Sequence, residues 1–200
     1  MAEDFESYRP IFADPYPAAW STIADFVFAT DLHLTRAKRA IVAGSDREAQ
    51  YIVERAYRCT FTVDGEAREL VVPAGMLTDL TSVPRLARWL VGRVGPHLEA
   101  AILHDFLFIA WQDVRVDGAP KQPRREDFAF ANEVMEAAMA AAGVARWKRA
   151  LIGFAVSSFV GRQVFFGPNP EPRYVRRTDA AAPDAAAPAP QVTREPPAAG

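Results

Sequence analysis

Residues 72–111 have the sequence VPAGMLTDLTSVPRLARWLVGRVGPHLEAAILHDFLFIAW, and the rest of the chain is arranged around this stretch. It holds the densest set of polar side chains among apolar neighbours, namely Thr78, Asp79, Thr81, Ser82, His104 and Asp105. The residues before it alternate as β-strands do, and the residues after it have the apolar spacing of helices. The sequence therefore predicts an α+β fold, in which a small antiparallel β-sheet is packed by about four C-terminal α-helices.

The clearest local signal is a β-hairpin over residues 52–72. Apolar and polar residues alternate in its first strand, which is typical of a strand with one buried face. That face is expected to consist of Tyr57, Cys59, Phe61 and Val63. Asp64 and Gly65 follow, and this dipeptide suits the positive φ angles of a tight hairpin turn. Cys59 is the one cysteine of the chain, and we expect it to be a small buried apolar group.

Apolar spacing and helix-breaking residues predict four helices after the hairpin. Their expected ranges are about 84–91, 96–112, 125–142 and 145–160. Ser82 is expected to cap the first of them, with Pro84 in the first turn, where the missing amide donor costs nothing. Gly161 is expected to end the fourth helix. A segment at 37–43 is compatible with either a strand or a helix.

The composition changes towards both ends of the chain, which predicts three parts. Residues 1–25 carry prolines among aromatic residues, which favours an irregular arm that packs on the domain or on a partner. Residues 26–165 are expected to form a single α+β domain. Residues 172–200 are dominated by alanine and proline, and such a segment buries too little apolar surface to offset its ordering entropy. We therefore expect a disordered tail there.

Charge and cysteine content exclude several classes of function. The net charge is −2 with both signs mixed along the chain, so there is no electrostatic case for nucleic acid as the main partner. A single cysteine excludes a metal site built from several thiolates. No basic segment is followed by an apolar run, and no apolar run approaches the roughly 20 residues that cross a bilayer. We expect a soluble protein that starts in the cytoplasm and has no membrane span.

Two interpretations of the polar cluster stay open. In the first, Asp79 and Ser82 cap the following helix, while His104 and Asp105 form a buried hydrogen-bonded pair that holds their helix to the Asp79 loop. In the second, these four residues are the catalytic site of a hydrolase, in which Asp79, His104 and Asp105 act as acid and base or as metal ligands, and Ser82 or Thr81 holds the substrate. Asp79, His104 and Asp105 are then the candidate ligands of a divalent metal. Adjacent helical residues point about 100° apart, so His104 and Asp105 cannot both face one point squarely.

Two further catalytic interpretations of the same residues each lack part of the pattern that they require. A His-Asp dipeptide on a helix resembles the metal-dependent phosphohydrolases named for that dipeptide. Those enzymes need further histidine and aspartate ligands on other helices, and this chain places none in a suitable helical context. A triad of Ser82, His104 and an aspartate lacks the glycines of a nucleophile elbow around the serine.

Several motifs follow one another over about residues 50–162: VPAGMLTDLTSVPR, then AAILHDFLF, then an arginine-rich loop that leads to ANEVMEAAMAAAGV and a final helix. Their order resembles a small family of uncharacterised proteins found in phages, prophages and related bacterial elements. The polar positions of the family fall on Thr78, Asp79, Ser82, Pro84, His104 and Asp105. Two positions depart from the family pattern. Thr81 stands where alanine is usual, and Asn132 stands where an aspartate is usual, which would weaken a site that used that aspartate as a ligand or base.

The resemblance implies a phage or gene-transfer-particle setting, and it assigns no reaction. Our first functional hypothesis is a virion-associated accessory protein whose polar cluster is mainly structural and whose partner is a protein of the particle. The arm at 1–25 and the tail at 172–200 both suit docking on such an assembly. The second hypothesis is a hydrolase, with or without a divalent metal.

Overall fold

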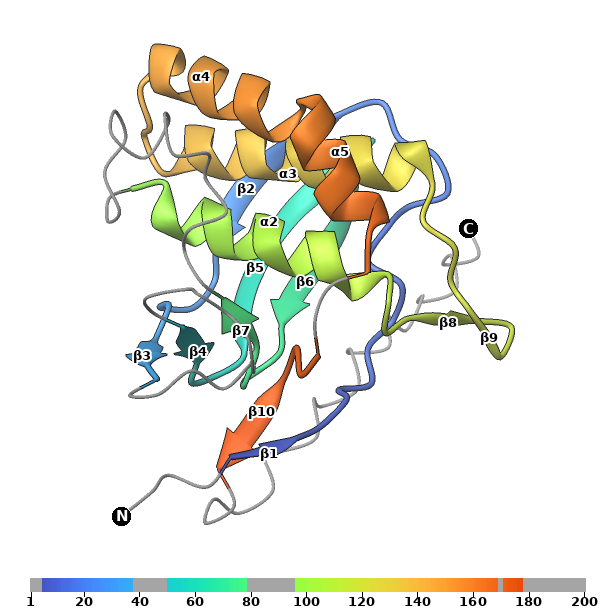
Figure 1. Cartoon of the computed structure of the whole chain (residues 1–200). Helices are drawn as coiled ribbons and strands as arrows, with labels where there is room; N and C mark the ends of the chain where they lie inside the picture. The colour runs from blue at the N-terminus through green and yellow to red at the C-terminus, as the bar shows by residue number, and fades with distance from the viewer. Residues whose placement is uncertain (1–4, 38–49, 79–95, 169–170, 178–200) are drawn as a thin grey trace, which may run out of the picture.

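The computed structural model describes residues 5–37, 50–78, 96–168 and 171–177 of the chain (Figure 1). The helix predicted over 84–91 and almost all of the segment 37–43 lie outside these residues. Within them, the α+β class is confirmed, because antiparallel strands form small sheets and four helices follow in the second half of the chain. None of the described helices is long and apolar enough to cross a membrane.

The main sheet is antiparallel and has the order β2 (Ile23–Phe28), β5 (Tyr57–Val63), β6 (Glu66–Val72). The predicted hairpin is confirmed, because β5 and β6 pair along their whole length on either side of the turn. Asp64 and Gly65 have φ angles of 53° and 81°, the conformation that a two-residue turn between twisted strands requires.

The side chains of β5 alternate between the core and the outer face of the sheet, as the sequence predicted. Those directed to the core are all buried: Tyr57, Cys59, Phe61 and Val63. Burial raises the pKa of the Cys59 thiol to about 12, so this group stays neutral. On the outer face, Thr60 pairs with Glu69 across the two strands, and both are exposed.

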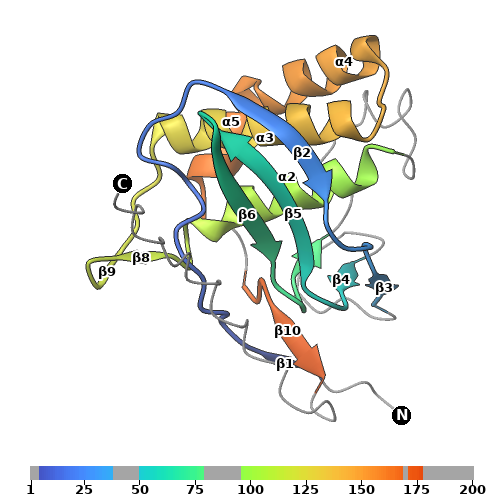
Figure 2. The ribbon, with the colours of Figure 1, turned by 180° about the vertical axis from the view of Figure 1, so that it is seen from behind.

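Helices α2 (Leu98–Ala110) and α3 (Arg125–Ala141) lie side by side on the main sheet (Figure 1). Their bounds agree with the predicted ranges. Figure 2 views the molecule from behind and shows the strands in front of the helices, so the described helices lie on one side of the sheet. The core is formed between this sheet and the two helices, where Phe61 of β5 contacts Phe130 of α3 with ring centroids 6.4 Å apart.

The fourth predicted helix is two helices, α4 (Arg146–Val156) and α5 (Phe159–Phe166). The prediction that Gly161 ends a helix is wrong, because Gly161 lies in the first turn of α5. Ser158 caps that turn by accepting a hydrogen bond from the Gly161 amide at 3.4 Å. A Cβ atom at Gly161 would lie 1.9 Å from the carbonyl oxygen of Val156. The glycine therefore permits the close approach of two helices rather than terminating one.

A second small sheet connects the main sheet to the polar stretch of the sequence. It has the order β3 (Leu34–Arg36), β4 (Tyr51–Val53), β7 (Leu77–Thr78). A two-stranded hairpin of β8 (Arg115–Val116) and β9 (Ala119–Pro120) follows α2.

Two short strands lie in the segments that the sequence predicted to be an arm and a tail. β1 (Phe5–Ser7) pairs with β10 (Val175–Arg177) in antiparallel register. On its other side, the segment that contains β10 bonds to the turn before β7, because the Val175 amide donates to the Gly75 carbonyl at 2.9 Å. Residues 173–177 thus lie between β1 and residues 75–77, and they hold both of those segments in place.

Buried ion pairs attach the first part of the chain to α3. Lys121 is almost fully buried, with its Nζ atom 2.6 Å from Asp14 and 3.5 Å from Asp127. Asp127 is fully buried in the first turn of α3 and also pairs with Arg124 at 2.7 Å. Arg124 in turn donates to the Pro17 carbonyl at 3.0 Å. A fully buried carboxylate needs such partners, because an unpaired charge in the interior is strongly destabilising.

We predict that Gly75→Ala lowers the free energy of unfolding far more than Gly118→Ala does. Both glycines have a φ angle of +80°, so both alanines carry the backbone cost of about 1 kcal/mol. A Cβ atom at Gly75 would also lie 2.0 Å from the carbonyl oxygen of Val175, whereas nothing lies within 4 Å of one at Gly118. We expect a further loss of about 1–3 kcal/mol for Gly75→Ala. Urea unfolding measures both values, and equal losses would contradict the packing of β10 on this turn.

Candidate functional site

The candidate site lies at the middle of α2, where two polar residues interrupt a helix that is otherwise apolar on almost every side. The apolar buried residues of α2 are Ala100, Ile102, Leu103, Phe106, Leu107, Phe108 and Ala110. A helix of this kind is covered by other elements all round, so its polar side chains must find partners on those elements.

His104 faces α3. Its side chain is 5% exposed, and its Nε2 atom lies 2.9 Å from Oδ1 of Asn132. The amide oxygen accepts, so Nε2 carries the proton. The imidazole ring also packs on Phe108, one helical turn later, with ring centroids 4.0 Å apart. His104 is therefore a buried, hydrogen-bonded link between α2 and α3.

The surroundings of His104 keep its imidazole neutral. Burial lowers the pKa of His104 from 6.5 to about 4, although the hydrogen bond with Asn132 acts in the opposite direction. An imidazole with so low a pKa is uncharged at neutral pH, so it is a weak base and has no imidazolium proton to give as a general acid. Asn132 brings no charge that would favour the imidazolium form, as an aspartate at that position would.

Asp105 faces away from His104, towards the second sheet. Its Oδ2 atom accepts a hydrogen bond from the hydroxyl group of Thr78 at 2.6 Å. Thr78 is buried and ends β7. The His-Asp dipeptide therefore bonds in two directions, to α3 through His104 and to β7 through Asp105. This divergence agrees with the angle of about 100° between neighbouring side chains on a helix.

The structure describes only part of the predicted site. His104 and Asp105 are described, whereas Asp79 and Ser82 lie outside the described residues, as do Thr81 and Pro84. Among the described residues, no three histidine, cysteine, aspartate or glutamate side chains come close enough to hold a metal ion. The predicted ligand set includes Asp79, so it stays a prediction.

Asn132 is the hydrogen-bond partner of His104, and the sequence analysis did not predict this contact. The sequence singled it out as a departure from a family pattern, but not as the neighbour of His104. A signal was present, because Asn132 stands four residues after Phe128 and three before Met135, both of which are buried. Helical spacing puts all three on the inner side of α3.

A second polar contact lies one turn nearer the start of α2. The hydroxyl of Tyr57 on β5 donates to the Glu99 carboxylate at 3.2 Å. Burial raises the pKa of Tyr57 above its ordinary value, with the Glu99 charge acting in the same direction. Glu99 also lies in the first turn of α2, where a negative charge favours the helix. Each of these polar residues of α2 thus contacts a different element of the fold.

One protein-family model matches the chain, described as protein of unknown function (DUF1353), over residues 52–156. This match covers just over half of the chain and includes the hairpin, α2, α3 and α4. It leaves out β1, β2, β3, α5, β10 and the first residue of β4. No curated protein and no solved structure matches the sequence.

We predict that the buried imidazole makes folding stability depend on pH. The folded-state pKa of His104 is depressed, so the unfolded chain binds a proton between pH 6.5 and about 4 that the folded protein does not. Stability should therefore fall with decreasing pH across this window, by up to about 1.4 kcal/mol per pH unit. Urea unfolding as a function of pH measures the slope. His104→Asn should reduce the slope of stability against pH. His33→Asn is the matched control, because His33 is exposed, and it should keep the slope. Equal slopes in both variants would exclude His104 as the source.

We predict that a carboxylate at position 132 raises the depressed pKa of His104. In Asn132→Asp the new charge lies next to Nε2 of His104, and we expect the pKa of His104 to rise by about 1–3 units from its value of about 4. An NMR titration of the histidine ring measures this directly. Glu133→Gln, at the neighbouring exposed position of α3, is the control and should leave the pKa of His104 near its original value. No rise in Asn132→Asp would contradict the contact between the two helices.

Proposed function

The chain belongs to the DUF1353 family of proteins of unknown function, and we propose that it is an accessory protein of a phage-like particle that works by binding a protein of that particle. In this proposal the polar residues of α2 hold the fold together and do no chemistry. The observation that carries the proposal is a group of exposed apolar side chains on the two outer helices, which we call the α4–α5 face. Its members are Trp147, Phe154, Phe159, Val160, Val164 and Phe166.

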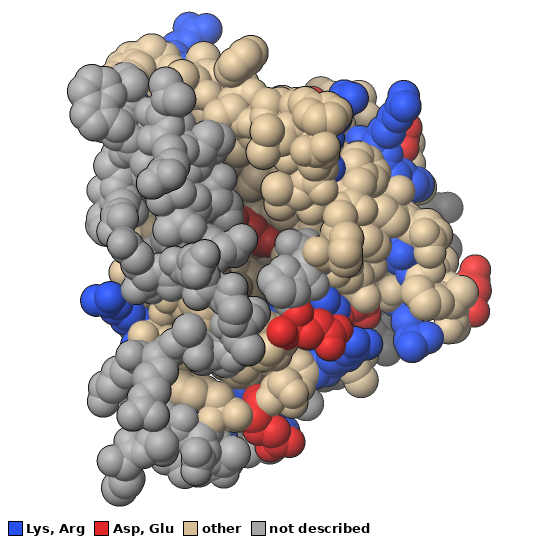
Figure 3. All heavy atoms as spheres, viewed as in Figure 1, with Lys and Arg blue, Asp and Glu red and all other residues tan. Residues whose placement is uncertain are grey.

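The α4–α5 face exposes several large apolar side chains close together. Phe154 is 80% exposed and Phe159 is 73% exposed, in adjoining turns of the two helices. Figure 3 shows a broad area with few charged side chains over α4 and α5. Single exposed apolar residues are common on protein surfaces, but a contiguous group of aromatic residues marks a surface that binds another protein or a membrane.

The spacing of these residues gives each helix an outward apolar stripe. Trp147 and Phe154 are seven residues apart on α4, and Phe159 and Phe166 are seven apart on α5, so each pair lies on one side of its helix. Tryptophan and phenylalanine supply much of the binding energy where they anchor in a partner's pocket. We therefore place the contact with the particle protein on this face.

The polar cluster supports the same proposal from inside the fold. His104 is buried, neutral and bonded to Asn132, so it lacks the open and titratable imidazole of a general acid or base. Asn132 replaces the aspartate that the resembling phage and prophage proteins usually carry. An aspartate would have formed a charged pair with His104, whereas the amide forms a neutral link.

The particle setting rests on the motif order of residues 50–162, which resembles phage and prophage proteins. An accessory protein made in the cytoplasm and then incorporated into a particle needs one stable contact with a neighbouring subunit. The α4–α5 face is suited to this role, and the mixed charge of the chain suits a protein partner better than nucleic acid.

The second interpretation, a hydrolase that uses Asp79, His104 and Asp105, stays a prediction with its own test. Its support is that Thr78, which directly precedes Asp79 in the chain, contacts Asp105 on α2. Hydrolysis of phosphoester or peptide substrates that requires a divalent cation and disappears in His104→Asn would favour the enzyme. Identical activity in the wild type and in His104→Asn would exclude it.

We predict that the double variant Phe154→Ser, Phe159→Ser weakens association with isolated tail or capsid components at least about tenfold. Both side chains are largely exposed, so their loss should leave the melting temperature almost unchanged. Co-sedimentation with the particle components measures the association. The control is Ile11→Ser, because Ile11 is 98% exposed but lies far from α4 and α5 in the sequence. Unchanged co-sedimentation of the double variant would exclude the α4–α5 face as the contact.

A further inference from the structure

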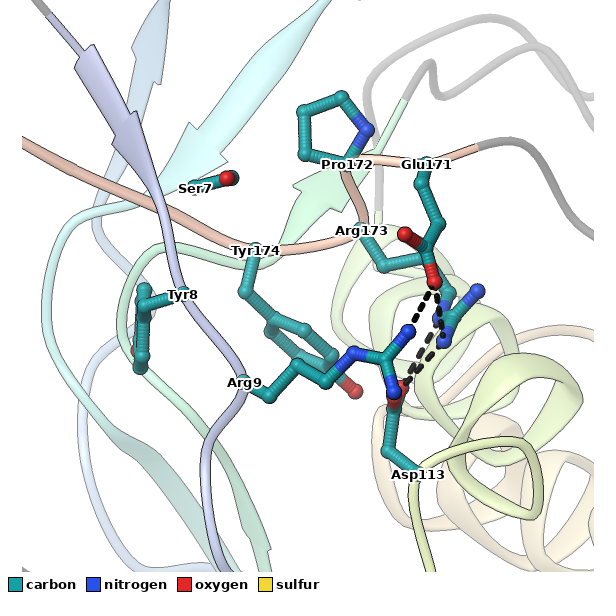
Figure 4. Close-up of a pocket in the computed structure, with 8 residues that line it drawn as sticks. All are labelled: Ser7, Tyr8, Arg9, Asp113, Glu171, Pro172, Arg173 and Tyr174. Carbon is teal, nitrogen blue, oxygen red and sulfur yellow. Dashed lines mark hydrogen bonds and ion pairs between the residues drawn. The ribbon is translucent and has the colours of Figure 1, made fainter.

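A second feature of the molecule lies where the two ends of the described chain meet. A pocket of about 380 Å³ is formed by residues 7–9 at the end of β1, residues 171–174 before β10, and Asp113 just after α2 (Figure 4). This volume is at the lower end of the range for small-molecule sites. We call it the terminal pocket.

One wall of the terminal pocket is a fixed ion pair. Arg173 donates to Asp113 through two atoms, Nε at 2.8 Å and Nη2 at 2.7 Å. The two side chains are only 8% and 1% exposed. The hydrogen bonds to Asp113 raise the pKa of Arg173 further, so its guanidinium stays charged. This geometry holds the guanidinium of Arg173 in one orientation at this wall of the pocket.

The buried hydroxyl group of Tyr174 lines the same pocket. Tyr174 is 1% exposed, yet its hydroxyl has no hydrogen-bond partner in the part of the chain that the structure describes. Figure 4 shows its ring directed towards the side of the pocket where Arg9 and Asp113 lie. Burial raises the pKa of Tyr174, so the group keeps its proton and is a donor. Buried donors without an acceptor are rare in folded proteins, and this one is placed to bond to a ligand.

The rim of the terminal pocket already holds a carboxylate between two guanidinium groups. Glu171 lies 2.5 Å from Arg9 and 3.4 Å from Arg173. Both Arg9 and Glu171 are more than half exposed, and an exposed ion pair of this kind contributes little to stability. Another carboxylate can therefore replace that of Glu171 next to Arg9 at small cost.

We propose that the terminal pocket binds a carboxylate group, which takes the place of Glu171 beside Arg9 and accepts a hydrogen bond from Tyr174. A carboxylate offers two planar acceptors that match a guanidinium group. It also carries one negative charge, as Glu171 does, so the charge of the pocket is conserved on exchange. A doubly charged phosphate in the place of Glu171 would add one more negative charge near Asp113, which makes it the less suitable ligand. The carboxylate belongs either to a small free acid or to an acidic residue of a bound protein segment.

The test compares two probes on the full chain, succinate and an acetylated, amidated peptide with one central glutamate. Backbone amide shifts in NMR titrations report binding at residues 7–9 and 171–174. Glu171→Gln removes the internal competitor and should tighten binding several-fold. Tyr174→Phe should weaken binding about tenfold, without loss of stability, because it removes no hydrogen bond within the described fold. Arg9→Gln should weaken binding at least as much.

Arg176→Gln is the matched control, because Arg176 lies on β10 but pairs with Glu6 and does not line the pocket. Binding of succinate alone identifies a small free acid, and binding of the peptide alone identifies an acidic protein segment. If neither probe shifts these residues in Glu171→Gln, where the competitor is absent, the proposal is overturned. It is also overturned if Tyr174→Phe and Arg176→Gln bind equally well.

Discussion

Helix α2 is apolar on almost every side, and the fold is arranged to cover it. A helix of this composition is unstable in contact with water, so several other elements must pack on it. The main sheet and α3 share one hydrophobic core with it. Phe12, from the first part of the chain, packs on Phe106 of α2, and Phe165 of α5 packs on Phe108. The polar residues of α2 then determine which neighbour lies on which side, because each of them needs a partner in the interior.

The two ends of the described chain are tied to the same region. Residues 173–177 bond to β1 on one side and to the turn at Gly75 on the other. That turn leads directly into β7, whose Thr78 contacts Asp105 of α2. The position of the predicted polar stretch therefore depends on strands that come from the first and last parts of the chain. Loosening β10 would remove the hydrogen bonds that support β7 from one side and leave its pairing with β4 on the other.

The polar groups of the interior and those of the surface differ in whether they are already bonded within the fold. Inside, His104 and Asp105 are bonded to α3 and β7, and the low pKa of His104 keeps it uncharged. At the surface, the α4–α5 face exposes aromatic side chains, and the terminal pocket is lined by charged groups and by the buried hydroxyl of Tyr174, which has no hydrogen-bond partner among the described residues. In the described interior these polar side chains link elements of the fold, whereas the two binding proposals rest on the α4–α5 face and on the terminal pocket.

The sequence by itself determined the elements that depend on local periodicity. The alternation of β5 and the Asp-Gly turn predicted the hairpin, and the apolar spacing of α2 and α3 predicted their bounds. It also showed that His104 and Asp105 diverge, since that follows from helix geometry alone. Only the tertiary structure decided that Gly161 lies in the first turn of α5 against the end of α4, that His104 bonds to Asn132, and that Arg173 pairs with Asp113. These contacts join residues that are far apart in the chain or depend on how two helices approach, and local periodicity carries no information about either.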